Sequence, residues 1–290
     1  MTHIVVTGGS GKLGRAVVAD LVDNGYQVTN LDRRPPADLR SAFVLVDFTD
    51  YGQVLAALLG VDDKYDTVDG IVHLAAIPAP GLTTNAATFT NNITSTHHIF
   101  AAARAAGIKR VVWASSETVL GLPFGPDSPP PYIPVDEEYH PRPSTSYSLS
   151  KTLEEEMARQ FCRWDPELSL TGLRFSNVMD PADYAAFPAF DADPTARMWN
   201  LWGYIDARDG AQAIRLALTA ARPGADVFII AAADTVMSRS SASLAAEVFP
   251  DVTVTRKLGG QETLLSIDKA CRVLGFAPQH SWREHTGQAD

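Results

Sequence analysis

Short apolar runs rich in β-branched residues alternate with segments of helical periodicity through the first part of the chain. Six such runs, each short enough for a strand buried on both faces, cover residues 3–7, 27–31, 43–46, 70–74, 110–114 and 168–173. Between them, apolar residues recur with helical spacing over residues 12–24, 51–59, 85–106 and 147–163. This alternation predicts a doubly wound parallel α/β sheet, in which ligands bind at the carboxyl ends of the strands.

The pattern changes in the second part of the chain. A proline-crowded stretch over residues 121–145 predicts a long ordered loop, and the sequence is irregular again after residue 174. Later elements are expected as a helix, a strand and two short helices, over residues 209–221, 226–231, 240–248 and 266–274. We therefore expect a sheet domain over residues 1–174, followed over 175–290 by a small C-terminal lobe that caps the ligand site and by helices that return to the sheet.

Composition excludes several classes of protein. The 290 residues are 46% hydrophobic and 20% charged, as in a soluble globular protein with ample core. A net charge of -10 without a basic cluster argues against nucleic-acid binding. No apolar run could cross a bilayer, and the chain starts like a strand, so a cytoplasmic location without membrane contact is expected. Cys162 and Cys271 lie far apart, and neither a disulfide nor a metal site is predicted.

A glycine motif, TGGSGKLG over residues 7–14, lies between the first predicted strand and the first predicted helix. Glycines with this GxxGxxG spacing allow a tight turn and let the backbone approach a pyrophosphate, while the helix N-terminus offers unpaired N–H groups. The motif therefore predicts a dinucleotide site. Its expected cofactor contacts are Gly8, Ser10, Gly11, Lys12, Leu13 and Gly14.

The ends of the next predicted strands supply further cofactor contacts. Asp32 follows the second strand, where a carboxylate binds the ribose hydroxyls and repels a 2′-phosphate, so NAD is favoured over NADP. The neighbouring Arg33 keeps NADP open, because a guanidinium can pair with that phosphate. Strand ends also place five residues beside the adenine and pyrophosphate, namely Asp47, Phe48, Leu74, Ala75 and Ala76.

The ordered motifs of the chain resemble the extended short-chain dehydrogenase/reductases, the superfamily of nucleotide-sugar epimerases, dehydratases and several sugar dehydrogenases. The resemblance extends to about residue 209. It is carried by the glycine motif and Asp32 and by residues 47–48, 73–76, 91–92, 113–116, 147–151 and 173–178. It implies a Rossmann fold, an NAD-dependent enzyme of carbohydrate metabolism and a homodimer. It also implies that Asn92 lies near the cofactor, although an Asn within a helix can instead serve a local hydrogen bond.

Tyr147 and Lys151 resemble the YxxxK catalytic pair of that superfamily. They lie one helical turn apart and share a helix face, where an ammonium favours the phenolate of a tyrosine whose ordinary pKa is about 10. Tyr147 can then remove a hydroxyl proton while hydride leaves the same carbon. Ser116 is expected to hydrogen-bond the reacting oxygen, and Lys151 to hold the nicotinamide ribose. The alternatives are an exposed helix pair for the tyrosine and lysine, and a turn former for the serine.

The predicted substrate side departs from the superfamily. Thr118 stands where sugar-nucleotide dehydratases carry a carboxylate, so dehydration is disfavoured. The interval after Asn177 is short and resembles that of the compact uronate dehydrogenases, whose arginine at the position of Arg197 holds the substrate carboxylate. The sequence also allows a salt bridge for this arginine, and Glu117 favours hydroxyls over carboxylates. The expected substrate contacts are Ser116, Glu117, Asn177, Arg197 and Trp202.

Three functions remain after these exclusions. The leading one is an NAD(P)-dependent oxidoreductase that oxidises a hydroxyl of a small sugar, sugar acid or polyol, so the partner is a carbohydrate-like small molecule. The second is a nucleotide-sugar epimerase of the UDP-glucose 4-epimerase kind, which retains NAD and gives no net reduction. The third is a non-catalytic dinucleotide sensor, disfavoured by the intact set of Ser116, Tyr147 and Lys151.

Overall fold

A parallel sheet forms the centre of the computed structural model, which describes residues 1–60 and 67–286. Within that described part, the sheet has seven strands in the order β3-β2-β1-β4-β5-β6-β9. The strands are β1 (His3–Thr7), β2 (Gln27–Asp32), β3 (Ala42–Leu45), β4 (Gly70–His73), β5 (Arg110–Ser116), β6 (Ser169–Phe175) and β9 (Gly224–Ile230). Strand order reverses between β1 and β4, and this switch point is where doubly wound folds open a ligand crevice.

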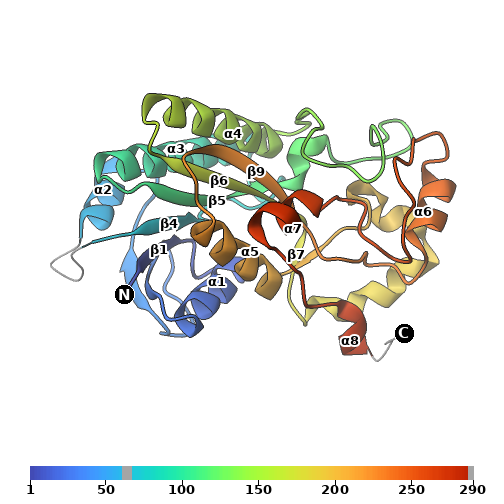
Figure 1. The fold of residues 1–290 in the computed structure, drawn as a ribbon, viewed down its shortest axis with the longest axis horizontal. Coiled ribbons are helices and arrows are strands. Elements are labelled where there is room, and N and C mark those ends of the chain that lie inside the picture. The colour runs from blue at the N-terminus through green and yellow to red at the C-terminus, as the bar shows by residue number, and fades with distance from the viewer. Residues whose placement is uncertain (61–66, 287–290) are drawn as a thin grey trace.

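Helices cover both faces of the sheet (Figure 1). One face packs against α1 (Lys12–Asp23), α5 (Ala207–Thr219) and α7 (Asp268–Leu274). The other face packs against α2 (Tyr51–Leu59), α3 (Asn85–Ala105) and α4 (Ser146–Trp164). Every β6 residue is buried, as expected for a strand covered on both sides. The predicted doubly wound parallel sheet is confirmed.

A second lobe lies beyond the carboxyl ends of the strands (Figure 1). It contains short elements: η1 (Glu117–Leu120), β7 (Val178–Met179), η2 (Asp183–Ala192), η3 (Pro194–Asn200), β8 (Ile205–Asp206), α6 (Ser241–Val248) and α8 (Trp282–Thr286). Its own apolar core includes the fully buried rings of Tyr184, Trp202, Tyr204 and Trp282. The proline-rich loop joins this core through bridges at Ile133 and Val135, and α5 and β9 then return the chain to the sheet.

A reciprocal cap fixes where α4 begins. The Thr145 hydroxyl accepts a hydrogen bond of 3.0 Å from the Ser148 N–H, and the Ser148 hydroxyl accepts one of 2.9 Å from the Thr145 N–H. Because the helix starts at Ser146, Tyr147 lies in its first turn, next to the end of β5. No helix in residues 1–60 or 67–286 has the length and apolarity needed to span a membrane.

Candidate active site

The glycine motif forms a turn in which backbone packs directly on backbone. Gly8 has a φ of 73°, and a Cβ on it would lie 2.7 Å from the Ala75 nitrogen. A Cβ on Gly14 would lie 2.1 Å from the Gly8 carbonyl oxygen, which leaves no room for any side chain. The N-terminus of α1 therefore faces the carboxyl edge of the sheet, where its N–H groups can bind an anion such as a phosphate.

Asp32 forms the wall next to this turn. Its Oδ2 accepts a hydrogen bond of 3.0 Å from the Ser10 N–H, and its Oδ1 accepts one of 3.1 Å from the Arg34 N–H. Each carboxylate oxygen can accept a second bond, so the group keeps capacity for ribose hydroxyls. A glycine cradle without side chains beside a fixed carboxylate fits a dinucleotide. Arg33 is exposed on the same wall.

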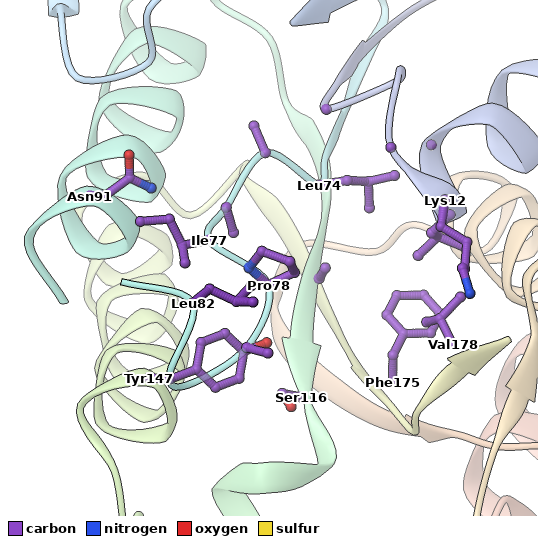
Figure 2. Close-up of a pocket in the computed structure, with 18 of the residues that line it drawn as sticks. Lys12, Leu74, Ile77, Pro78, Leu82, Asn91, Ser116, Tyr147, Phe175 and Val178 are labelled. Carbon is purple, nitrogen blue, oxygen red and sulfur yellow. The ribbon is translucent and has the colours of Figure 1, made fainter. Parts of the chain in front are cut away.

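A cavity of 1570 Å³ runs along the carboxyl edge from the glycine turn to Tyr147. Figure 2 shows the Tyr147 phenol pointing toward the strand that carries Ser116, with Lys12 and Val178 at another part of the wall. The lining includes most of the residues predicted from the sequence: Gly8, Ser10, Gly11, Lys12, Leu13, Gly14, Asp32, Arg33, Asp47, Phe48, Leu74, Ala75, Ala76, Ser116, Glu117, Tyr147 and Asn177.

Four predicted site residues lie behind this wall. Asn92 is buried and bonds the backbone of Ile77, accepting from its N–H at 2.8 Å and donating to its carbonyl at 3.0 Å, so it shapes a lining loop. Trp202 is buried in the second lobe and donates its indole N–H to the Pro194 carbonyl at 2.7 Å. Lys151 and Arg197 are buried beside the cavity.

Several lining residues escaped the sequence analysis. Most of them follow β4 or β5 in segments whose sequence signal is proline, and they add apolar surface to the cavity: Pro78, Leu82, Leu122 and Pro123. Trp199 lines the cavity from η3.

Tyr147, Lys151 and Ser116 meet where α4 passes the end of β5. Burial raises the pKa of Tyr147, whereas the Lys151 charge and the nearby Ser116 hydroxyl lower it; the net direction is upward, so the phenol is protonated in this form. The Lys151 ammonium donates 2.9 Å hydrogen bonds to the Ala114 carbonyl and to Glu154 Oε2. The Lys151 charge favours the phenolate, and a further positive charge nearby would favour it more, so that Tyr147 could act as a base.

Glu117 and Arg197 form a second buried charged group, on the lobe side of the cavity. Glu117 accepts hydrogen bonds from the Ser176 hydroxyl at 2.5 Å and from the Asn200 amide at 3.1 Å. Burial raises the pKa of Glu117 to about 7, although these bonds and the Arg197 charge act in the opposite direction. The Arg197 guanidinium donates to the Gly203 carbonyl at 3.0 Å and stacks near the Trp199 ring.

A doubly wound sheet with a glycine turn, an acidic residue after β2 and a Tyr–Lys pair on one helix defines a short-chain dehydrogenase/reductase fold. Residues 4–231 match the NAD dependent epimerase/dehydratase family, and the chain belongs to that family. The resemblance drawn from the sequence is thus confirmed, as is NAD as the predicted cofactor. Within residues 1–60 and 67–286 no cluster of His, Cys, Asp or Glu could hold a metal ion.

The chain is similar to known epimerases along most of its length. Mouse UDP-glucose 4-epimerase is 29% identical over 221 residues, which cover 71% of this chain and 61% of that protein. The Bacillus subtilis UDP-glucose 4-epimerase is 26% identical over 213 residues, with 70% and 59% covered. The chain therefore spans about three fifths of the length of these curated relatives.

Solved structures show the same fold. An NAD-bound short-chain dehydrogenase/reductase superfamily protein from Agrobacterium tumefaciens superposes with a TM-score of 0.74 at 24% identity, covering 99% of this chain and 95% of that one. A mutated uronate dehydrogenase superposes with a TM-score of 0.66 at 23% identity, covering 99% and 86%. At these identities the likeness concerns the fold.

Proposed function

We propose that this protein is an NAD-dependent oxidoreductase that oxidises a hydroxyl of a small, neutral, sugar-like molecule. The observation that carries the proposal is that one continuous cavity holds both groups: the glycine turn and Asp32 line one end, and Tyr147 and Ser116 line the other. Bound NAD would supply the hydride acceptor. The turn, the helix N-terminus and Asp32 would hold its phosphates and ribose.

The hydrogen bonds of Ser116 suit it to hold the reacting oxygen. Its Oγ accepts from both the N–H and the hydroxyl of Thr118, at 3.2 and 3.0 Å. The proton of Ser116 is thereby left to point elsewhere, toward the cavity. A substrate oxygen that accepts this proton lies beside Tyr147, which takes the hydroxyl proton while the buried Lys151 charge stabilises the phenolate.

Arg197 and Glu117 favour a neutral substrate over a sugar acid. One guanidinium nitrogen of Arg197 is bonded to the Gly203 carbonyl, and the charge of Glu117 lies close by. A substrate carboxylate would have to compete with Glu117 for the Arg197 charge. An ionised Glu117 would also repel that carboxylate. Hydroxyl groups meet no such repulsion, and they can bond a carboxyl group in either protonation state.

A UDP-glucose 4-epimerase activity is the second candidate, because the curated relatives named above carry that name. The same tyrosine and serine would serve it. The two reactions differ in outcome, since in the epimerase the hydride returns to the substrate and no NADH accumulates. A homodimer and a cytoplasmic location stay predictions from the sequence.

Cofactor reduction tests this proposal. Purified protein with NAD or NADP is offered free aldoses, polyols, uronic acids and UDP-sugars, and we expect NADH with a neutral sugar or polyol. Tyr147→Phe should lower kcat about 10²- to 10⁴-fold, the range for a general base, while NAD still binds. Tyr51→Phe, at an exposed tyrosine of α2 that does not line the cavity, is the matched control. Interconversion of a UDP-sugar without net NADH would establish the epimerase instead.

A further inference from the structure

Glu154 is a fully buried carboxylate that the proposed chemistry leaves without a role. It lies on α4 one turn beyond Lys151, with its side chain 0% exposed, and its Oε2 accepts the 2.9 Å hydrogen bond from the Lys151 ammonium. Its Oε1 makes no hydrogen bond of standard geometry to the described residues. Removing a carboxylate from water is strongly unfavourable unless a nearby charge compensates it, so the burial of Glu154 depends on its ion pair with Lys151.

The other charged groups nearby are committed elsewhere. Glu155, the next residue on α4, accepts two hydrogen bonds from the Arg174 guanidinium, at 2.9 and 2.8 Å, and one from the Ser115 hydroxyl at 2.7 Å. The β6 arginine is thus engaged by Glu155. The cation that faces Glu154 is Lys151, which in turn lies beside Tyr147.

The groups that face the pair from β4 and α3 are neutral. Burial and the Lys151 charge lower the pKa of His73, on β4, to about 3, so its imidazole is uncharged. Thr7 Oγ1 lies 3.2 Å from the N–H groups of both Leu74 and Ala75, from which it accepts, and its proton therefore goes to His73 Nδ1 at 2.8 Å.

The tautomer of His73 fixes the direction in which the hydrogen bonds run from Thr7 through His73 to Thr96. With Nδ1 accepting, His73 carries its proton on Nε2 and donates it to the Thr96 hydroxyl at 3.2 Å. The Thr96 proton is then available to Glu154. Burial raises the pKa of Glu154, and Lys151 and Thr96 act against that rise. The remaining charge near the phenol, Glu117 on η1, lies on the lobe side.

We propose that Glu154 is a positioning residue: it holds the Lys151 ammonium in place and sets the pH window in which Tyr147 accepts a proton. The inference rests on the proposed function, because it acts through that tyrosine and lysine. A negative charge favours the protonated form of each neighbour. Glu154 accordingly raises the pKa of both Tyr147 and Lys151, and the active window moves to higher pH.

Glu154→Gln keeps the side-chain size and removes the charge. We expect the pH profile of kcat/KM to move to lower pH on both limbs, by about one unit or more, the size of effect that a charge in direct contact produces. Glu154→Asp restores a charge and should move the profile back toward that of the wild type. Glu156→Gln, an exposed carboxylate paired with Arg159 on the same helix, is the control and should leave the profile unchanged. A Glu154→Gln profile that coincides with the wild type overturns the inference.

A second measurement needs no turnover. The ultraviolet absorbance of tyrosinate is followed against pH in wild type and in Glu154→Gln, each with the curve of its Tyr147→Phe counterpart subtracted. We expect Tyr147 to ionise at lower pH in the Gln variant, with circular dichroism confirming that both fold. If the pKa of Tyr147 shifts but the protein turns over no substrate, the role of Glu154 is supported and the proposed function is wrong. If the protein turns over a substrate but the pKa of Tyr147 does not shift, the proposed function is supported and the role of Glu154 is wrong.

Discussion

The two ends of the cavity are built on different principles. At the dinucleotide end, shape comes from backbone: Gly8 and Gly14 admit no side chain, and backbone N–H groups anchor the half-buried carboxylate of Asp32. At the lobe end, the charges of Glu117 and Arg197 are buried, and side chains from separate segments hold them. Steric fit therefore governs the first end, whereas protonation governs the second.

The physical reason for this difference is desolvation. Burial removes a carboxylate from water, which disfavours its charged form and raises its pKa. Glu117 is the clearest case, because burial brings its pKa to about 7. Changes of pH near neutrality should therefore act on substrate binding more than on cofactor binding.

Glu117→Gln should produce the largest effect among the tests of this contrast. The pKa of Glu117 rises from 4.5 to about 7 on folding, so the folded protein holds a proton that the unfolded chain has released. Stability from this group is complete below pH 4.5 and is lost as pH rises to about 7, a loss of about 3 kcal/mol. The Gln variant should show no such loss. Urea unfolding on both sides of that interval measures it.

The exposed Glu138 supplies the control for this experiment. Glu138→Gln makes the same chemical change at an exposed position, and we expect it to unfold as the wild type does. If Glu117→Gln and the wild type lose equal stability as pH rises, buried charge is not what distinguishes the lobe end of the cavity.

Gly14→Ala tests the steric end. Its Cβ would lie 2.1 Å from the Gly8 oxygen and 2.6 Å from the Gly9 Cα, so the turn must open. We expect a cost of about 1–3 kcal/mol in the free energy of unfolding, as for overpacking, together with weaker NAD binding. Calorimetric titration with NAD and thermal unfolding measure the two effects.

Gly25→Ala distinguishes the effect of left-handed backbone strain from the effect of steric overlap at the glycine turn. Gly25 has a φ of 81° but no atom within 4 Å of its would-be Cβ, and it lies at the far end of α1. This variant should lose stability through its left-handed backbone and still bind NAD as the wild type does. Equal loss of NAD affinity in both alanine variants would mean that the glycine turn has no special role.

The contrast also explains which features were predictable from sequence. The glycine motif of the dinucleotide end consists of residues close together in the chain, and a local pattern predicts it. The lobe end depends on long-range contacts. Leu201 and Trp202 have φ values of 55° and 57° although neither is a glycine, so their own residue types do not signal the turn. Trp202 then enters the lobe core, and Arg197 turns toward Gly203, so neither lies in the cavity lining.

The charge of Glu154 shows a further limit of sequence patterns. Its position on α4 is clear from helical periodicity, yet the same spacing is consistent with an exposed partner for Lys151. Only the packing of α3 and β5 against this face shows that the pair is buried. Burial converts an ordinary i, i+3 pair into a group that can set a catalytic pH range.

Lys12 links the glycine turn to the second lobe, and its replacement should have the smallest effect. Its ammonium pairs with Asp183 at the start of η2 and lies 4.0 Å from Asp180. Because the lysine and both carboxylates are about one third exposed, Lys12→Ala should cost less than about 1 kcal/mol, and the cost should shrink in about 1 M salt. Arg40→Ala breaks a comparable exposed pair with Asp23, away from the cavity lining.

Thermal unfolding with and without NAD compares the two variants. Both should lower the unfolding temperature by a similar small amount, and Lys12→Ala alone should reduce the stabilisation by NAD, because its side chain lines the cavity. A loss of several kcal/mol in Lys12→Ala would mean that this pair couples the lobe to the sheet. The lobe and the glycine turn would then be coupled, and a pH change that protonates or ionises Glu117 would also change the affinity for NAD.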